Sequence, residues 1–277
     1  MRAVVICLLV LLGCREEGTS VPRASGAPLR LVSLTPSATE VIAALDATAQ
    51  LVGVDEYSTF PPEVATLPKV GSFLAPNLEM IVALRPTLVI VDDIHKPSAA
   101  ALRDAGLATV ECPIHSLPDV ERALRTVGAR IGKTAEAERV VEEIERALVA
   151  ARAARPARRP RVLAVIDREA GGLGNLVAVG PGSWIDELLA VVGGENVLAA
   201  SGVRYPKISL EEVLRARPDV ILDLSYAGRA GTDAWQAVDV PAVKAGRVLG
   251  LAEPYLVAPS PRVKAALETL AKALAPP

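Results

Sequence analysis

The sequence predicts an α/β protein with two lobes, each built on a mostly parallel sheet, joined by one long backbone helix. Three observations support this prediction: short apolar strands alternate with amphipathic helices, a long helical stretch without Gly or Pro occupies the middle, and a helix-strand unit occurs in both halves. The 277 residues are 51% hydrophobic and 22% charged, which is enough for two separate cores. We expect an N-terminal lobe over residues 29–133, a linking helix over 134–156 and a C-terminal lobe over 157–277.

The first 14 residues have the features of a lipoprotein signal peptide. A basic start at Arg2 precedes an apolar run that is too short to cross a bilayer, and Leu11-Leu12-Gly13-Cys14 resembles a bacterial lipobox. Cleavage before Cys14 would leave this residue lipidated and hold the chain at a membrane, because each buried methylene contributes about 0.8 kcal/mol. The polar residues 15–28 would then form a tether. A secretory signal that is cut elsewhere is the alternative.

Seven short apolar segments are predicted to be strands, and helix-length segments separate them. The first helix is expected from about Ser37 to Leu45. Because strands and helices alternate, the strands are expected to lie parallel, as in βαβ units. The predicted strands are residues 31–34, 51–54, 88–91, 109–110, 162–166, 220–222 and 248–251.

The stretch from Thr134 to Arg155 predicts the linking helix. It is rich in Ala, Glu and Arg, and Pro156 marks its end. The basic residues 158–161 that follow are interpreted as a solvated segment rather than a binding patch. The apolar positions at helical spacing are Val140, Val141, Ile144, Leu148 and Val149.

An internal repeat supports two related lobes, because residues 77–90 align without gaps with residues 209–222. Each copy contains a capping residue, a glutamate in the first helical turn, and a proline between helix and strand. A carboxylate in the first turn is stabilised by the positive end of the helix dipole. The two glutamates could therefore serve only to stabilise the helices. The matched pairs are Asn77 and Ser209, Glu79 and Glu211, and Pro86 and Pro218.

Several function classes are disfavoured by the sequence. A net charge of −2 without a dense Lys/Arg stripe argues against nucleic-acid binding. Residues 128–134 resemble a phosphate-binding loop but have the wrong spacing and follow a helix, so we predict a helix break there. Residues 171–174 lack the third glycine of a dinucleotide-binding loop and are predicted to form a mobile loop. The chain also lacks the G-x-S-x-G elbow of hydrolases.

No metal site is expected. His95 and His115 are the only histidines, too few for a zinc-capture site with three histidines. Asp92-Asp93-Ile94-His95 offers ligating groups, but polar residues are ordinary just beyond a strand, and His115 is interpreted as a loop residue. Cys112 is expected to be a small buried hydrophobic residue, since it is the one thiol beyond Cys14.

Four segments in order resemble the periplasmic cobalamin-binding proteins of ABC importers, which belong to the helical-backbone (class III) periplasmic binding proteins. The resemblance runs from about Leu29 to Leu274 and implies two α/β lobes that move little about one long helix. The wider fold also serves haem and iron-siderophore receptors, so the resemblance is more specific for fold than for ligand. The segments are residues 33–40, 56–62, 77–86 and 193–197.

The resemblance implies a corrinoid ligand, such as cobalamin, held in the cleft by aromatic side chains at Tyr57, Phe73, Tyr205 and Tyr255. Aromatic rings bury large areas with little loss of conformational freedom. Core or loop packing is the alternative role for these residues. The chain needs no resident cofactor, because the corrinoid is the transported ligand. Phe73 and Tyr205 stand where the family often has tryptophan.

Ligand identity stays open between a corrinoid, haem and an iron-siderophore. Haem receptors of this fold commonly place an axial tyrosine directly after the glycine that is Gly71 here, and Ser72 stands at that position, although Tyr57 or Tyr205 could take the role. Apart from Arg204, the expected cleft residues are not basic, which disfavours an anionic siderophore.

The resemblance also implies partners. One surface glutamate on each lobe pairs with arginines of the permease in such proteins, and Glu79 and Glu211 occupy those positions. The expected partners are therefore the ABC permease with its ATPase, the corrinoid, and a membrane reached through the lipid on Cys14. A non-transport sensor and a two-lobed enzyme are the remaining alternatives, and the enzyme would require a clustered acid/base set that the sequence does not show.

Overall fold

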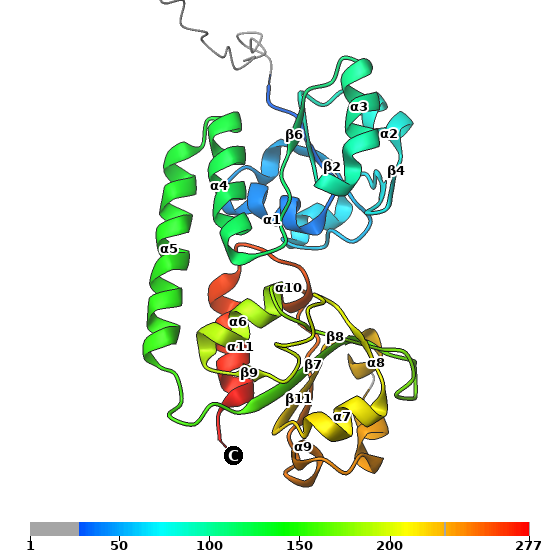
Figure 1. Cartoon of the computed structure of the whole chain (residues 1–277). Coiled ribbons are helices and arrows are strands. Elements are labelled where there is room, and N and C mark those ends of the chain that lie inside the picture. The colour runs from blue at the N-terminus through cyan, green and yellow to red at the C-terminus, as the bar shows by residue number, and fades with distance from the viewer. Residues whose placement is uncertain (1–27, 230, 277) are drawn as a thin grey trace, which may run out of the picture.

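The computed structural model describes residues 28–229 and 231–276. It shows two α/β lobes, one above the other in Figure 1, with α5 (Thr134–Ala153) running along one side of both. The predicted α/β architecture with a long connecting helix is confirmed. The chain passes from the first lobe to the second once, through this helix.

The N-terminal lobe contains a parallel four-stranded sheet in the order β2-β1-β5-β6. All four strands were predicted, and β2 and β5 have the predicted bounds. The strands are β1 Leu31–Ser33, β2 Leu51–Val54, β5 Leu88–Val91 and β6 Thr109–Glu111, with a small hairpin of β3 Gly71–Ser72 and β4 Ala75–Pro76. The helices are α1 Pro36–Ala44, α2 Leu78–Ala83, α3 Lys96–Asp104 and α4 Leu117–Ile131, with 3-10 turns at Thr48–Gln50, Pro62–Thr66 and Asp93–His95.

The linking helix α5 starts after a glycine that ends helix α4 and lets the chain turn. Gly132 ends α4 with φ +80°, a left-handed conformation that glycine adopts at little cost, and α5 begins at Thr134. The helix break predicted for residues 128–134 is therefore confirmed. One face of α5 is buried against α4, α6 and α11 through Ala137, Val141, Ile144 and Leu148.

The C-terminal lobe contains a mixed sheet in the order β10-β8-β7-β11-β12, with β9 also paired to β7. Strands β7, β11 and β12 are parallel, as predicted. β8 pairs antiparallel with both β7 and β10, and neither β8 nor β10 was predicted. The strands are β7 Arg161–Asp167, β8 Leu176–Ala178, β9 Glu195–Asn196, β10 Lys207–Ile208, β11 Val220–Asp223 and β12 Val248–Gly250. The helices are α6 Trp184–Val192, α7 Leu210–Ala216, α8 Tyr226–Arg229, α9 Pro241–Lys244, α10 Pro254–Val257 and α11 Val263–Leu274, with a 3-10 turn at Asp233–Ala237.

The internal repeat is present as structure. In both copies a capped helix, α2 or α7, leads into a central strand, β5 or β11. The Asn77 side chain accepts from the Met80 N–H, and the Ser209 side chain accepts from the Glu212 N–H. The likeness extends to the backbone, because the aligned residues Arg85 and Arg217 have φ of +48° and +46°.

Cys112 is buried at the end of β6, as the sequence predicts. Burial raises the pKa of its thiol to about 12, so the side chain acts as a small apolar group rather than a nucleophile.

Within the described residues, no helix has the length and apolar character required to cross a membrane. The predicted signal peptide, the lipidation site Cys14 and nearly all of the predicted tether lie outside those residues.

Candidate functional site

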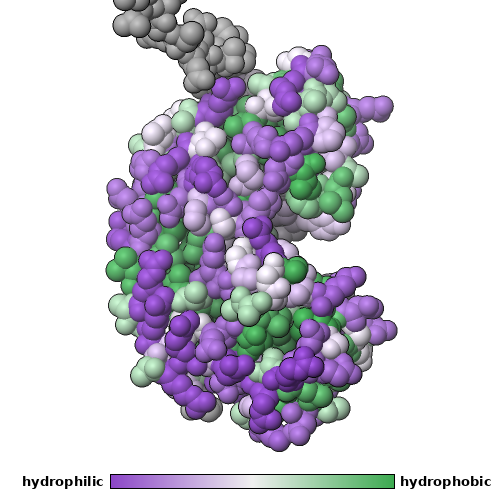
Figure 2. Space-filling view, viewed as in Figure 1, coloured by the Kyte–Doolittle hydropathy of each residue, from purple (hydrophilic) through white to green (hydrophobic). Residues whose placement is uncertain are grey.

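The candidate site lies between the lobes, where the surface is hollowed on the side opposite α5 (Figure 2). Because the N-terminal sheet is parallel, the carboxyl ends of its strands meet at one edge, which faces the second lobe in Figure 1. Polar side chains follow these ends: Asp55 after β2, and Asp92 and Asp93 after β5.

A buried hydroxyl network supports this edge. The Thr39 hydroxyl hydrogen-bonds to the Ser58 hydroxyl at 2.7 Å, and Ser58 in turn donates to the Asp55 carboxylate. The Asp55 carboxylate also accepts from the Tyr57 N–H at 2.9 Å, which fixes the loop that carries Tyr57. Burial raises the pKa of Asp55 although these hydrogen bonds oppose the shift.

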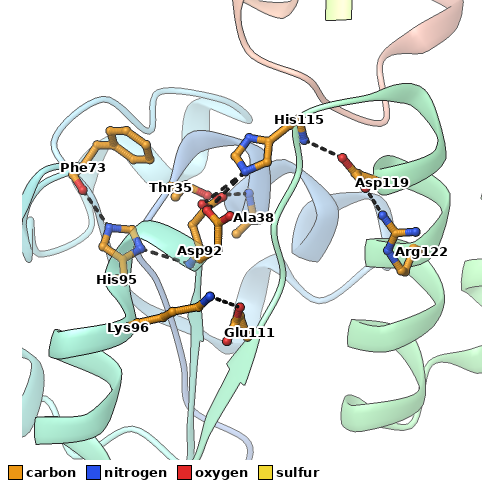
Figure 3. A network of polar contacts seen from close by, with 11 residues as sticks. Thr35, Ala38, Phe73, Asp92, His95, Lys96, Glu111, His115, Asp119 and Arg122 are labelled. Carbon is orange, nitrogen blue, oxygen red and sulfur yellow. Dashed lines mark hydrogen bonds and ion pairs between the residues drawn. The ribbon is translucent and has the colours of Figure 1, made fainter. Parts of the chain in front are cut away.

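His95 has a structural role at the same edge (Figure 3). The Asp92 N–H donates to His95 Nδ1 at 3.0 Å, so the ring proton is on Nε2, which donates to the Phe73 carbonyl at 2.7 Å. The Phe73 ring packs against the His95 ring edge-on, with centroids 5.7 Å apart. His95 therefore fixes the position of Phe73, and both of its ring nitrogens are occupied.

His115, rather than His95, approaches the two aspartates. Its Nε2 lies 3.3 Å from Asp93 Oδ1 and 3.6 Å from Asp92 Oδ1. Figure 3 shows the His115 ring directed toward Asp92. One ligating atom of each of these three residues lies within 4.8 Å of the others. In the sequence, Asp92 and Asp93 stand beside His95, and His115 was interpreted as an ordinary loop residue. The structure instead groups both aspartates with His115.

The predicted aromatic contacts lie on both lobes. Tyr57, 64% exposed, follows β2, and Tyr205, 43% exposed, precedes β10. Phe73 is partly buried in the β3–β4 turn. Tyr255 is partly buried, and its hydroxyl hydrogen-bonds to Thr269 at 3.0 Å, so its ring is fixed beside α11. Tyr57 and Tyr205 thus present the most open ring surface of the four.

A hydrogen bond joins the two lobes between α4 and α6. The Leu117 N–H of the first lobe donates to Glu187 Oε2 of the second lobe at 2.6 Å. Burial raises the pKa of Glu187, and the hydrogen bond from Leu117 and the charge of Arg204 oppose this shift. The segment that carries Tyr205 is joined to the residues before α6, because the Gly180 N–H donates to the Arg204 carbonyl at 2.8 Å.

Both predicted docking glutamates are exposed in the first turns of their helices, Glu79 in α2 and Glu211 in α7. The Glu212 side chain accepts from the Ser209 N–H at 2.7 Å and completes the capping box there. The capping box thus uses Glu212, while hydrogen bonds to its own backbone N–H and to Ser209 lower the pKa of the neighbouring Glu211.

Tyr226 is a further exposed aromatic residue near a strand end that was not singled out from the sequence. It is 85% exposed at the start of α8, beyond the carboxyl end of β11. An aromatic residue four positions after the predicted strand 220–222 is the signal that could have drawn attention to it, because ligands of open α/β sheets bind at that edge.

Two lobes with facing strand ends and exposed aromatic rings define a solute-binding protein. A family model described as periplasmic binding protein matches residues 31–255, and the chain belongs to this family. It is therefore a periplasmic binding protein and not an enzyme.

Relatives agree with this assignment. The chain is 28% identical over 244 residues to the vitamin B12-binding protein of Vibrio cholerae, with 86% of each chain covered. Among solved structures, the periplasmic haem-binding protein RhuT from Roseiflexus sp. RS-1 in apo form is 31% identical, with a TM-score of 0.80, covering 90% of this chain and 98% of RhuT. The periplasmic vitamin B12-binding protein BtuF of Vibrio cholerae is 27% identical, with a TM-score of 0.73, covering 88% of this chain and 96% of BtuF.

Proposed function

We propose that the protein captures a corrinoid such as cobalamin between its lobes and delivers it to an ABC importer. The observation that carries the proposal is that exposed tyrosines stand on loops of opposite lobes, Tyr57 on one and Tyr205 on the other. A flat macrocycle offers apolar area to such rings, and a well-stacked aromatic pair contributes about 0.5–1.5 kcal/mol beyond the buried area. Similarity to vitamin B12-binding proteins over most of the chain supports this ligand.

Haem is the second candidate, because RhuT, a haem-binding protein, has the higher identity and TM-score of the two solved structures. A haem site of this fold requires an axial ligand, and Ser72 stands where an axial tyrosine would be expected. Burial raises the pKa of the Tyr205 phenol, which disfavours the phenolate that binds ferric iron. The corrinoid requires no such ligand from the protein, so we favour it.

Delivery to the importer is proposed to use Glu79 and Glu211 as contacts for arginines of the permease. Each is exposed and starts the repeated helix of its own lobe, so a membrane partner could contact both lobes at once. Exposed ion pairs contribute about 0–1 kcal/mol each, and they would therefore govern orientation and association rate more than affinity. Lipidation of Cys14 is proposed to hold the protein at the membrane where the importer lies.

A calorimetric titration of the purified protein with cyanocobalamin tests the ligand, with haemin and a ferric siderophore in parallel. We expect one-to-one, submicromolar binding of the corrinoid and much weaker binding of the other two compounds. Binding of haemin alone would identify haem as the ligand, and binding of the siderophore alone would identify a ferric siderophore as the ligand. No binding of any of the three would contradict the proposed function.

A further inference from the structure

We propose that Asp92, Asp93 and His115 form a binding site for one divalent transition-metal cation at the cleft edge of the N-terminal lobe. The three side chains come from two segments, the turn after β5 and the loop between β6 and α4, and one ligating atom of each lies within 4.8 Å of the others. In Figure 3 the His115 ring is directed toward Asp92. All three lie in one lobe, so the site does not depend on the identity of the transported solute.

The distances fit a metal ion. In a tetrahedral site with metal–ligand bonds of about 2.1 Å, two ligand atoms lie about 3.4 Å apart. His115 Nε2 lies 3.3 Å from Asp93 Oδ1 and 3.6 Å from Asp92 Oδ1. The longer separation exceeds hydrogen-bonding range but suits two ligands of a shared cation. One imidazole and two carboxylates are typical ligands of zinc and related divalent ions.

One buried oxygen of the Asp92 carboxylate lacks a hydrogen-bond donor, and the ring of His115 stands 3.6 Å from it. Its side chain is only 5% exposed, and no donor group of the described residues reaches its Oδ1. A buried carboxylate oxygen without a donor is costly, so a cation at this point would replace a missing interaction. The neighbouring basic residue Lys96 is turned to Glu111, 3.9 Å from its carboxylate.

The ring of His115 contacts the two aspartates through Nε2 and supplies the route of entry. Its side chain is 37% exposed, and its backbone N–H donates to Asp119 at 3.0 Å, which fixes the loop at its base. His95 cannot replace it, since both of its ring nitrogens are engaged. The exposed side of His115 leaves room for water to complete the coordination of the ion, as in open zinc sites.

Calorimetric titration of the untagged, chelator-treated protein with zinc chloride at pH 7.5 tests the site. We expect one site with a dissociation constant in the micromolar range or below, and at least a tenfold loss of affinity in His115→Gln and in Asp92→Asn. Asp104→Asn, which changes an exposed aspartate at the end of α3, should bind zinc like the wild type.

Thermal unfolding provides a second measurement, because a ligand that binds only the folded state raises Tm. Zinc should raise the Tm of the wild type and of Asp104→Asn, and it should leave the Tm of His115→Gln unchanged. His115 is partly exposed, so this variant is expected to fold even if Asp92→Asn does not. Absence of zinc binding, or equal binding by wild type and His115→Gln, would overturn the proposal.

Discussion

The Arg262 guanidinium donates two hydrogen bonds to the Glu40 carboxylate and so joins the two lobes by an ion pair. Its Nε lies 2.8 Å from Glu40 Oε2, and a terminal nitrogen contacts the other carboxylate oxygen. Glu40 belongs to α1, whereas Arg262 precedes α11, 222 residues later. The guanidinium carbon also lies 4.1 Å from the centre of the Phe60 ring and 4.8 Å from that of Tyr255. This contact supplements α5 as a connection between the lobes.

Replacement of Arg262 by alanine is predicted to destabilise the protein by about 3 kcal/mol. The change leaves the Glu40 carboxylate buried without its partner, and breaking a buried ion pair costs about 3–5 kcal/mol, the lower value applying here because Arg262 retains some exposure. Urea unfolding of the wild type and variant measures the difference in the free energy of unfolding.

Arg139→Ala is the matched control, because Arg139 pairs with Asp46 and Glu143 at the exposed surface and should contribute less than about 1 kcal/mol. The double variant Arg262→Ala with Glu40→Gln should lose less stability than the sum of the two single changes, since the two side chains interact directly. Additive losses would show that the ion pair does not couple the lobes.

Tyr205→Ala is predicted to weaken corrinoid binding at least about tenfold, or about 1.4 kcal/mol, through loss of ring area and stacking. Tyr205 is exposed before the edge strand β10, so the variant should unfold at the wild-type temperature. Tyr205→Phe keeps the ring and should retain most of the affinity. Calorimetry with cyanocobalamin measures both variants, and wild-type affinity in Tyr205→Ala would remove this residue from the site.

The double variant Glu79→Arg with Glu211→Arg is predicted to bind the ligand normally and to fail in transport. Both positions are exposed in the first turns of their helices, and arginine at each would repel the proposed permease arginines. Uptake into vesicles that contain the permease and ATPase measures transport. Glu142→Arg, which changes an exposed glutamate on α5, is the control and should transport normally. Normal uptake with the double variant would exclude docking through this pair.

Most of the fold could be predicted because its elements carry strong local signals. The linking helix α5 has a continuous apolar stripe, and the repeated unit has caps and prolines that fix both ends of the helix. Strands β8 and β10 were missed because the alternation of strands and helices predicts parallel strands only. β8 follows β7 without an intervening helix and pairs antiparallel with both β7 and β10.

The site was less predictable because it depends on contacts between distant segments. His115 and Asp93 are 22 residues apart, and only the pairing of β5 with β6 brings their loops together. Arg262 and Glu40 are even more distant, and neither is unusual in its own segment. Sequence patterns report the periodicity of single elements, whereas these contacts depend on how the elements pack.

The wild type is predicted to lose free energy of unfolding through Asp55 as pH rises from about 4 toward neutrality, and Asp55→Asn is predicted to remove this loss. Burial raises the pKa of Asp55 above its ordinary value of 3.8, so in that window the folded state keeps a proton that the unfolded state has released. The free energy of unfolding of the wild type therefore falls with rising pH through this group, and asparagine removes the titration while keeping an acceptor for the Tyr57 N–H.

Urea unfolding at pH 4, 5, 6 and 7 measures this effect as the difference between wild type and variant. The free energy of unfolding of Asp55→Asn should increase relative to that of the wild type as pH rises, because only the wild type must ionise a buried carboxyl group at position 55. The exposed Asp104→Asn variant should follow the wild-type curve. Parallel curves for wild type and Asp55→Asn would mean that the Ser58 and Tyr57 hydrogen bonds fully compensate for burial of the charge.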